Sequence, residues 1–499
     1  MGSTSIPEQF AGQVALAPAA VAPAAVAAAA DGSTPERKAG MTTTGIDPAA
    51  TAAETVPLSL HQEFVSLFDQ GSADGPFGSR YHLVAAWRVT GAPVDPDVLG
   101  DALYDVVERH EALRTRIVGA AGERRQEILP PSPVRLDVRD FPPVPAGERA
   151  ERAAALTQEF ETETISAHEV PFLRATLARF DDRDAVLVLM AHHLAVDALS
   201  LGVIIRDLAN RYAARTGHPA PELPAAPQYR EFGDWQRESA GPAAQAARDY
   251  WRRRLDGALF TAIPTDIPRS AGHPESTAKH RFTLPADVAA GIDRLARAGR
   301  SSRFMAIAAM YQLLVHRLTG ATDVVIATFT PGRAGGRFED SVGSFFNFVP
   351  LRTDLAGCAT YEDVLKRTRR TCLEAFTNDI PSLQIFGAAP QLMEPAMTDN
   401  ATAAVLESVP DPKQAVEAPG DLKWVRITRL TGSQPLSSAV PDGALWDINK
   451  DPSGDIIGSV SYKSNLFHDA TIASMTADFA QIARAFSVSP DASPQWGGR

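Results

Sequence analysis

Hydrophobic and polar positions along the chain follow two periods, one typical of helices and the other of strands. Between residues 95 and 110, apolar side chains recur every three or four positions, which predicts an amphipathic helix. The run DAVLVLMAHH at 184–193 is apolar almost throughout. Such a run predicts a strand buried on both faces, inside a sheet covered by helices.

The same reasoning predicts elements over most of the chain. Helices are expected at 58–68, 95–110, 147–167, 199–214, 236–255, 286–298, 303–319, 361–377 and 468–486. Strands are expected at 82–89, 184–193, 280–284, 323–330 and 344–355, and in succession within 421–463, with a glycine-rich turn at 332–336. Both halves carry a similar mixture of strands and helices, which indicates an α/β fold built from two related lobes.

Composition suggests where the lobes begin and end. Residues 1–55 are rich in Ala, Pro and Thr and nearly lack large apolar side chains, so we expect a disordered arm, either passive or used to dock a partner. The Pro- and Ala-rich segment at 217–227 is the best candidate for a linker. We therefore expect an N-terminal lobe at 56–222, a C-terminal lobe at 223–490 and a tail at 491–499.

Charge and cysteine usage exclude several classes of protein. The net charge of the 499 residues is -12 and the charges are well mixed, which argues against nucleic-acid binding. Two cysteines, Cys358 and Cys372, cannot form a disulfide framework and fit a reducing cytoplasm. No apolar run is long enough for a membrane span, and the Ala-rich run at 13–30 lacks the preceding basic residues of a secretory signal.

The candidate chemistry lies in MAHHLAVDALS at 190–200, where the buried strand gives way to a helix. Side chains alternate along a strand, so His192 and His193 should point in opposite directions, and only one can readily serve a common site. A neutral imidazole suits a general base near pH 7. Asp197 could orient that imidazole, or it could hold the loop by pairing with an arginine elsewhere. The residues alone leave both open.

Other interpretations of this segment are structural or metal-binding. Buried histidines with structural partners are common, and adjacent histidines on a strand diverge, which is unfavourable for a metal ion that needs three or four ligands. The chain has no G-x-S-x-G nucleophile elbow, no G-x-G-x-x-G pattern and no P-loop. We therefore expect neither a bound metal nor a bound cofactor.

HHLAVDA resembles the His-His-x-x-x-Asp-Gly signature of condensation domains from nonribosomal peptide synthetases, within the chloramphenicol-acetyltransferase-like superfamily. Further segments resemble the family in the same order, from about residue 57 to 490. They are PLSLHQEFVSLFDQ (57–70), RHEALRTRIV (109–118), QYREFGDWQRE, DYWRRRL (249–255), SRFMAIAAMYQLLVHRLTGATDVVIATFTPGR (302–333), EDSVGSFFNFVPLR (339–352) and SVSYKSNLFHDATI (459–472).

The resemblance implies a V-shaped pair of acetyltransferase-like lobes with the site in a tunnel between them. His193 matches the catalytic histidine of the signature, and His192 matches its usually structural neighbour. Asp197 matches an aspartate that holds the loop, and Arg333 matches its arginine partner. The acyl donor would arrive as a thioester on the phosphopantetheine arm of an acyl or peptidyl carrier protein, acting in trans, and a small-molecule acceptor would enter from the other side.

Four more residues are assigned to the tunnel by the resemblance. Three of them, Gly343, Phe345 and Asn347, belong to the family's Gly-x-Phe-x-Asn-x-x-x-x-Arg motif. Arg352 completes that motif and is not counted among the four. Ala198 stands where the signature has glycine, which adds a methyl group beside the expected reacting centre.

The opening segment HQEF at 61–64 also departs from the family, because it lacks the usual arginine and tryptophan. The expected function is that of a free-standing condensation enzyme that forms an amide or ester bond in natural-product biosynthesis. Two alternatives stay open: an acyltransferase that uses coenzyme A, and a recruitment module without activity.

Overall fold

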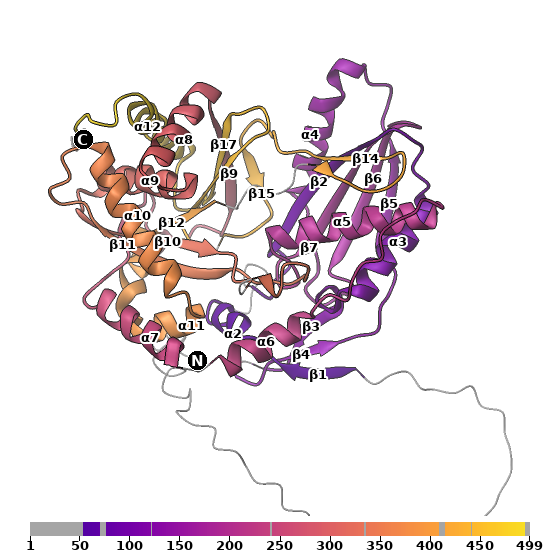
Figure 1. Cartoon of the computed structure of the whole chain (residues 1–499), viewed down its shortest axis with the longest axis horizontal. Coiled ribbons are helices and arrows are strands. Elements are labelled where there is room, and N and C mark those ends of the chain that lie inside the picture. Colours follow the sequence, from indigo (N-terminus) through magenta and orange to yellow (C-terminus); the bar gives the residue numbers. More distant parts are fainter. Residues whose placement is uncertain are drawn as a thin grey trace, which may run out of the picture.

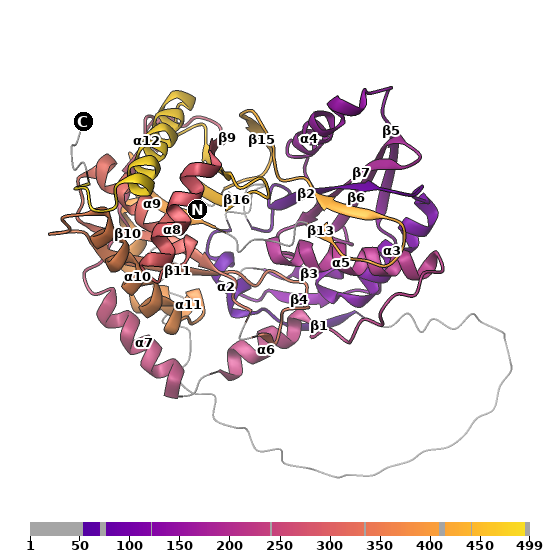
Figure 2. The same cartoon turned by 45° about the horizontal axis from the view of Figure 1, so that its top comes forward.

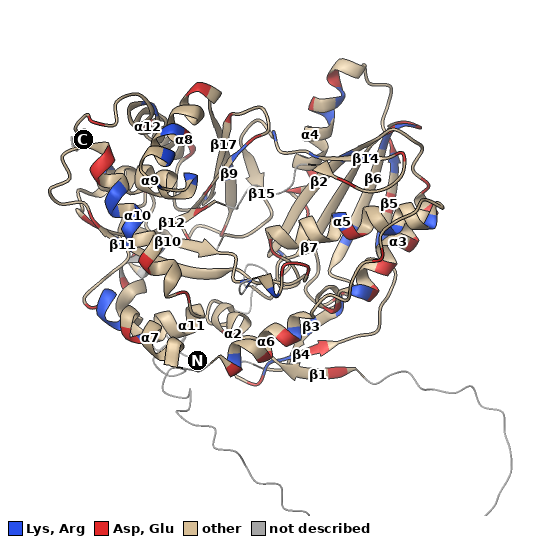
Figure 3. Cartoon of the chain, viewed as in Figure 1, with Lys and Arg blue, Asp and Glu red and all other residues tan. Residues whose placement is uncertain are grey.

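The computed structural model describes residues 53–69, 76–120, 122–239, 242–333, 336–408, 415–440 and 442–494. Most of the expected N-terminal arm and residues 495–499 of the expected tail lie outside these ranges. The chain forms two α/β lobes that lie side by side (Figure 1). Basic and acidic residues are interspersed along both lobes (Figure 3). No helix within the described ranges is both long and apolar enough to cross a bilayer.

The first lobe is built on a sheet with the strand order β13-β14-β2-β7-β6-β5. Its strands from the first half of the chain are β2 (His82–Thr90), β5 (Arg135–Asp140), β6 (Leu173–Asp181) and β7 (Asp184–His192). Helices α3 (Pro96–Arg109) and α5 (Ala198–Arg215) cover one face, and α4 (Arg149–Phe160) covers the other. Along β7, Leu187 packs on the first face and Val188 on the second. The predicted strand buried on both faces is therefore confirmed.

A small sheet lies beside this lobe. Its order is β1-β4-β3, all antiparallel, formed by β1 (Glu54–Pro57), β3 (Thr115–Val118) and β4 (Arg125–Ile128). Short 3-10 turns occur at Glu111–Arg114, Ala146–Glu148, Arg269–Ala271 and Pro390–Met397.

The second lobe has the sheet order β11-β10-β12-β16-β17-β9-β15, with β8 beside β12. The strands are β8 (Ala262–Pro264), β9 (Thr277–Leu284), β10 (Asp323–Thr330), β11 (Asn347–Asp354), β12 (Ala401–Glu407), β15 (Gln434–Leu436), β16 (Ala444–Lys450) and β17 (Ile456–Lys463). Helices α8 (Ala286–Ala298), α9 (Arg303–Thr319), α10 (Tyr361–Thr377) and α12 (Asp469–Val488) lie on the side away from the first lobe (Figure 1). Tyr311, Trp446 and Phe479 pack between these helices and the sheet.

The two lobes exchange segments. Strand β14 (Lys423–Arg426) pairs with β2 of the first lobe, β13 (Ala415–Val416) pairs with β14, and Trp424 is buried in the first lobe's core. In the opposite direction, α2 (Leu60–Ser66) places Phe64 against aromatic rings of the second lobe. These segments cross the predicted boundary between residues 222 and 223, and local periodicity could not predict this because pairing between distant strands leaves no mark on it.

The helix predicted at 236–255 is wrong as a single element. The structure has α6 (Tyr229–Glu238) and a separate α7 (Pro242–Arg254). Proline has no backbone N–H to continue a preceding helix but fits the first turn of a new one. Pro242 opens α7 for this reason. A short helix, α11 (Ser382–Ala388), was not predicted.

Candidate active site

His192 is the last residue of β7 and is fully buried. Its Nε2 lies 2.9 Å from the Gly78 carbonyl oxygen, and its Nδ1 accepts the backbone N–H of Leu194 at 3.3 Å. The carbonyl can only accept, so Nε2 carries the ring proton. Burial lowers the pKa of His192 to about 3. Both ring nitrogens are occupied, so this neutral imidazole holds the strand end in place.

His193 follows in the turn and is half-buried. Its Nδ1 lies 2.8 Å from the Val196 carbonyl oxygen, so Nδ1 carries the proton and Nε2 keeps a lone pair. No described residue donates a hydrogen bond to Nε2. The ring stacks on Tyr81 with centroids 4.7 Å apart, and Phe346 lies 5.2 Å away. Burial lowers the pKa of His193, and the Val196 carbonyl and Asp197 offset only part of this. The residue is therefore a neutral base with a fixed tautomer.

Asp197 caps the N-terminus of α5 and does not contact the His193 ring. Its Oδ1 accepts hydrogen bonds from the backbone N–H and the hydroxyl of Ser200, both at 2.7 Å, and from Arg333 Nη2 at 2.8 Å. Its Oδ2 accepts the backbone N–H of Phe345 at 3.3 Å. Of the two roles that the residues alone left open, the structure has the loop-holding contact with an arginine.

Arg333 follows β10 and ties a segment of the second lobe beneath α5. Its Nη1 donates to the carbonyl oxygens of Phe338 at 2.7 Å and Ser341 at 2.8 Å, and its guanidinium lies 4.3 Å from the centre of the Phe345 ring. The preceding Gly332 has φ +64°, and a Cβ there would lie 1.8 Å from the Phe345 carbonyl oxygen. Only glycine fits this close approach.

The other predicted tunnel residues pack around this loop. A Cβ at Gly343 would lie 2.2 Å from the Tyr229 ring, and Phe345 is buried among aromatic rings. Asn347 donates to Asp379 at 2.6 Å and to the Ile380 carbonyl oxygen at 2.7 Å. Gly343, Phe345 and Asn347 form no hydrogen bond or ring contact with His193. Ala198 is half-buried and opens α5.

The sequence analysis missed two residues near His193, Tyr81 and Phe346, and it named His61 only as part of the departure in the opening segment. Phe346 lies between Phe345 and Asn347, and alternation along the run FFNF would have turned it to the opposite side. His61 of α2 lies with its ring centroid 4.3 Å from that of Phe346 and its Nε2 3.3 Å from the Ser344 hydroxyl. Burial lowers the pKa of His61 to about 3, with His193 as a second cause. The departure in the opening segment therefore lies at the site.

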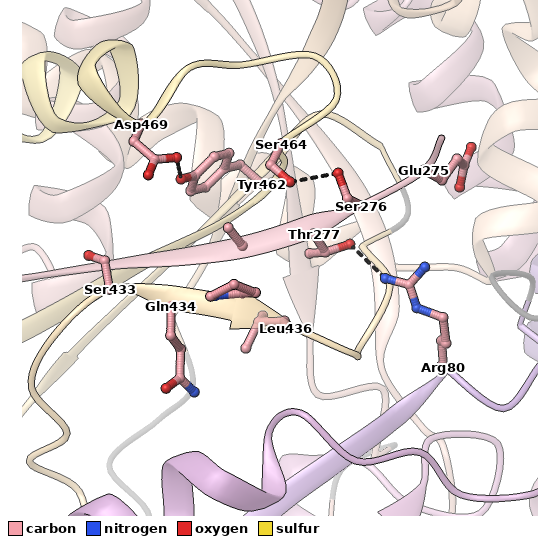
Figure 4. A pocket seen from close by; sticks show the side chains of 12 residues that line it. Arg80, Glu275, Ser276, Thr277, Ser433, Gln434, Leu436, Tyr462, Ser464 and Asp469 are labelled. Carbon is pink, nitrogen blue, oxygen red and sulfur yellow. Dashed lines mark hydrogen bonds between the residues drawn. The ribbon is translucent and has the colours of Figure 1, made fainter. Parts of the chain in front are cut away.

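A cavity of about 420 Å³ lies where the lobes meet (Figure 4). Arg80 contributes from the first lobe, next to Tyr81, and donates to Thr277 on β9 at 3.4 Å and to the Ser437 carbonyl oxygen at 2.5 Å. The remaining lining comes from Glu275 to Ala278, Ser433 to Leu436, Tyr462, Ser464 and Asp469. This cavity lies next to Tyr81, the stacking partner of His193, because Arg80 precedes Tyr81 in the chain.

Comparison with known proteins decides the family. A model of the condensation domain matches residues 52–391, more than half of the chain. The chain belongs to the condensation-domain family. Relatives include phosphinothricin tripeptide synthetase PhsC of Streptomyces viridochromogenes, 31% identical over 442 residues, and the probable non-canonical nonribosomal peptide synthetase CymA of Salinispora arenicola, 32% identical over 478 residues. The alignments cover 87% and 92% of this chain but only 39% of PhsC and 6% of CymA.

Solved structures agree with the two-lobed fold. The crystal structure of SgcC5 from Streptomyces globisporus is 47% identical, with a TM-score of 0.84 over 88% of this chain and 100% of that chain. The X-domain from teicoplanin biosynthesis, at 22% identity, has a TM-score of 0.68 over 89% of this chain and 98% of that chain. At that identity the likeness shows the fold alone. Family, fold and a general link to nonribosomal peptide synthesis are thereby established.

Proposed function

We propose that this chain is a condensation enzyme that transfers an acyl group from a carrier-bound phosphopantetheine thioester to an acceptor, through a tunnel between the lobes. The observation that carries the proposal is His193 Nε2, which keeps its lone pair while Nδ1 is held by the Val196 carbonyl. The acceptor's X–H group donates to Nε2 and its heteroatom attacks the thioester carbonyl carbon. The C–S bond then breaks and the pantetheine thiol leaves with the proton.

The acceptor that we favour is an alcohol, which would make the product an ester. SgcC5 was solved in complex with (R)-(-)-1-(2-naphthyl)-1,2-ethanediol, a vicinal diol on an aromatic ring. A hydroxyl is a weaker nucleophile than an amine and gains more from a base. Orientation of the two reactants contributes most of the remaining acceleration, roughly 7–11 kcal/mol at best. The acyl group of the donor is already activated as a thioester, so the step needs no bound cofactor. The carrier and the enzyme would meet in the cytoplasm.

The test is acyl transfer from an acylated carrier protein to an aromatic vicinal diol and to the matching amine. His193→Ala should lower kcat/KM by at least a hundredfold. The matched control is His316→Ala, because His316 makes the same kind of Nδ1-to-carbonyl hydrogen bond, to Ala321 at 2.7 Å, on a helix of the second lobe. Its turnover should match the unmodified protein.

Three outcomes would contradict the proposal. Equal turnover after His193→Ala would remove the base. Efficient turnover with acyl-coenzyme A and no gain from a carrier would favour a coenzyme-dependent acyltransferase. Tight binding of the carrier with no transfer from any donor would favour a recruitment module.

A further inference from the structure

A second cavity, of about 570 Å³, lies on the first lobe where four segments of the chain meet. Helix α5 contributes Arg206 and Asn210 to its lining, and the predicted linker contributes residues 221–224. Two segments from the second half of the chain complete the lining. They are the loop after β10, through Asp340, and the stretch between β13 and β14, through residues 417–419. The cavity therefore joins the linker to two segments that cross between the lobes.

The charged groups that line this cavity are mainly acidic. Glu222, Asp340 and Glu417 contribute three carboxylates, and Arg206 contributes the one guanidinium of the lining. That guanidinium is already paired, with Asp340 and, at 2.8 Å, with Asp207. Within the described part of the chain, no Lys, Arg or His forms an ion pair with Glu222 or Glu417, and both residues are exposed. The charge that would complement this lining is therefore positive.

A buried acceptor in the same lining has no donor. Asn210 is 6% exposed, and its Nδ2 donates to the Arg206 carbonyl oxygen, one helical turn earlier, at 2.8 Å. This contact identifies the donor end of the carboxamide and leaves Oδ1 as an acceptor without a partner among the described residues. A buried acceptor without a donor is unfavourable. The matching occupant is therefore a cation that carries several N–H donors.

The first described residues of the chain lie close to this cavity. Glu54, at the start of β1, pairs with Arg230 at 2.6 Å, and Arg230 follows Pro224 of the lining by six residues, a span of at most about 20 Å. Before Glu54, the only basic residues of the sequence are Arg37 and Lys38. A segment as long as that from Arg37 to Glu54 spans roughly 20–25 Å as a coil and up to about 60 Å when extended. Arg37 is therefore within reach of the cavity.

We propose that the guanidinium of Arg37 binds in this cavity, between the carboxylates of Glu222 and Glu417, and donates to Asn210 Oδ1. A guanidinium has five N–H donors in one plane and can serve all three groups at once, whereas the ammonium of Lys38 is a point charge. The covalent connection gives a local concentration on the order of 1 mM, so a site with a dissociation constant of about 0.1 mM is roughly nine-tenths occupied. The N-terminal segment thereby ties the linker to the stretch between β13 and β14.

Trypsin tests the proposal on the full chain, because Arg37 and its neighbour are the only basic residues before β1. A bound Arg37 is protected, so cleavage there should be at least tenfold slower in the unmodified protein than in the double variant Glu222→Gln with Glu417→Gln. The matched control is Glu148→Gln with Glu169→Gln, which removes two exposed carboxylates of the first lobe outside the cavity. Its cleavage should stay as slow as that of the unmodified protein. Mass spectrometry of the released fragments gives the rates.

A second measurement separates Arg37 from its neighbour. Exchange of backbone amide hydrogens, followed by mass spectrometry, should be about tenfold faster at residues 217–224 and 415–419 in Arg37→Gln, because the bound state is lost. Lys38→Gln, which removes the same charge from the next residue, should leave this exchange unchanged. Neither measurement depends on acyl transfer, so the results are independent of the proposed function.

Several results would overturn the proposal. Equal cleavage rates in the unmodified protein and in the double variant at Glu222 and Glu417 would show that the cavity does not protect Arg37. Protection that falls as the protein is diluted would place a second copy's segment in the cavity instead. Exchange that is faster in Lys38→Gln as well would remove the assignment to the guanidinium. If the double variant fails to fold, Asn210→Leu, which removes the acceptor and keeps the side-chain size, takes its place and should raise the cleavage rate.

Discussion

At the scale of the residue, two adjacent histidines differ in which nitrogen carries the proton. The strand period predicted that they would diverge, and this much could be read from the sequence. The tautomers could not be read from the sequence, because they depend on two carbonyl groups that folding brings to the rings. The Gly78 carbonyl lies at Nε2 of His192, and the Val196 carbonyl lies at Nδ1 of His193. His192 has both nitrogens engaged, and only His193 keeps a lone pair for a substrate.

The lowered pKa of His193 makes a prediction for activity. Because burial holds this pKa below the usual 6.5, the imidazole stays a neutral base in mildly acidic solution. The acid limb of a plot of kcat/KM against pH should therefore lie below pH 6.5. Initial rates with an acylated carrier, measured from pH 4.5 to 9, provide the test, and a limb centred at 6.5 or above would refute the assignment.

A second prediction concerns stability. His61 and His192, with pKa values lowered to about 3, stay neutral in the folded state at pH 5, whereas the unfolded chain takes up protons near pH 6.5. The unfolded state binds more protons, so stability falls as the pH drops from about 6.5 toward 3. Each histidine should remove about 2 kcal/mol between pH 7 and 5.

The variant His61→Gln cannot titrate and should lose about 2 kcal/mol less than the unmodified protein between these pH values. Urea unfolding followed by tryptophan fluorescence measures this difference. His273→Gln, at an exposed histidine, serves as the control and should keep the full pH dependence. An identical loss in the His61 variant would show that its imidazole is not the group that titrates.

At the scale of the element, the periodicity of the sequence predicted the long helices and buried strands well. The helices at 303–319 and 361–377 and the strand at 323–330 have the predicted bounds, because their apolar faces cover a continuous core. Strands β6 and β12 were not predicted. Each has a short central stretch that is buried without alternation, from Ala175 to Ala178 in β6 and from Thr402 to Leu406 in β12, and such a stretch does not distinguish strand from helix.

The loop after β10 could be predicted only through the family resemblance. Its position follows from the buried pair of Asp197 and Arg333, whose side chains are 7% and 6% exposed. Asp197→Ala leaves a buried guanidinium without its carboxylate and should destabilise the protein by roughly 3–5 kcal/mol.

The matched control for this pair is Asp323→Ala. Asp323 and Arg352 are also 2.8 Å apart, but Asp323 is 48% exposed, so its loss should cost less than about 1 kcal/mol. Urea unfolding of both variants gives the comparison. Similar losses at the two sites would mean that burial does not set the strength of the Asp197 contact.

At the scale of the whole molecule, the lobes are joined by segments that cross between them. Strand β14, helix α2 and the segment from Phe338 to Phe345 each pack in the lobe to which they do not belong by sequence. Local patterning cannot specify such exchanges, since each depends on a partner far away in the sequence, as for Arg333 and Asp197. The candidate active site is assembled by the same exchange, because Phe346 from the second lobe packs near His193 from the first.

One inter-lobe contact rests on a single carboxylate. Glu161, 10% exposed at the end of α4, binds Lys279 and Arg281 of β9, and Gln434 of β15 donates to it at 2.8 Å. Helix α4 and strand β15 lie near each other where the lobes meet (Figure 2). Burial alone would raise the pKa of Glu161, but the two cations lower it, so the group is charged at neutral pH. Glu161→Gln removes this charge and leaves Arg281, 8% exposed, without a carboxylate.

We expect this change to weaken the contact between the lobes by roughly 3 kcal/mol, which raises the ratio of open to closed molecules at equilibrium about a hundredfold. Hydrogen exchange followed by mass spectrometry should therefore accelerate in β9 and β15, whereas exchange in α9, far from the junction, should be unchanged. Glu159→Gln is the control, because Glu159 lies on the same helix but pairs with Arg152 at the surface and is 49% exposed. If β9 and β15 exchange equally in both variants, the lobes are held together by the exchanged segments and the Glu161 contact adds nothing measurable.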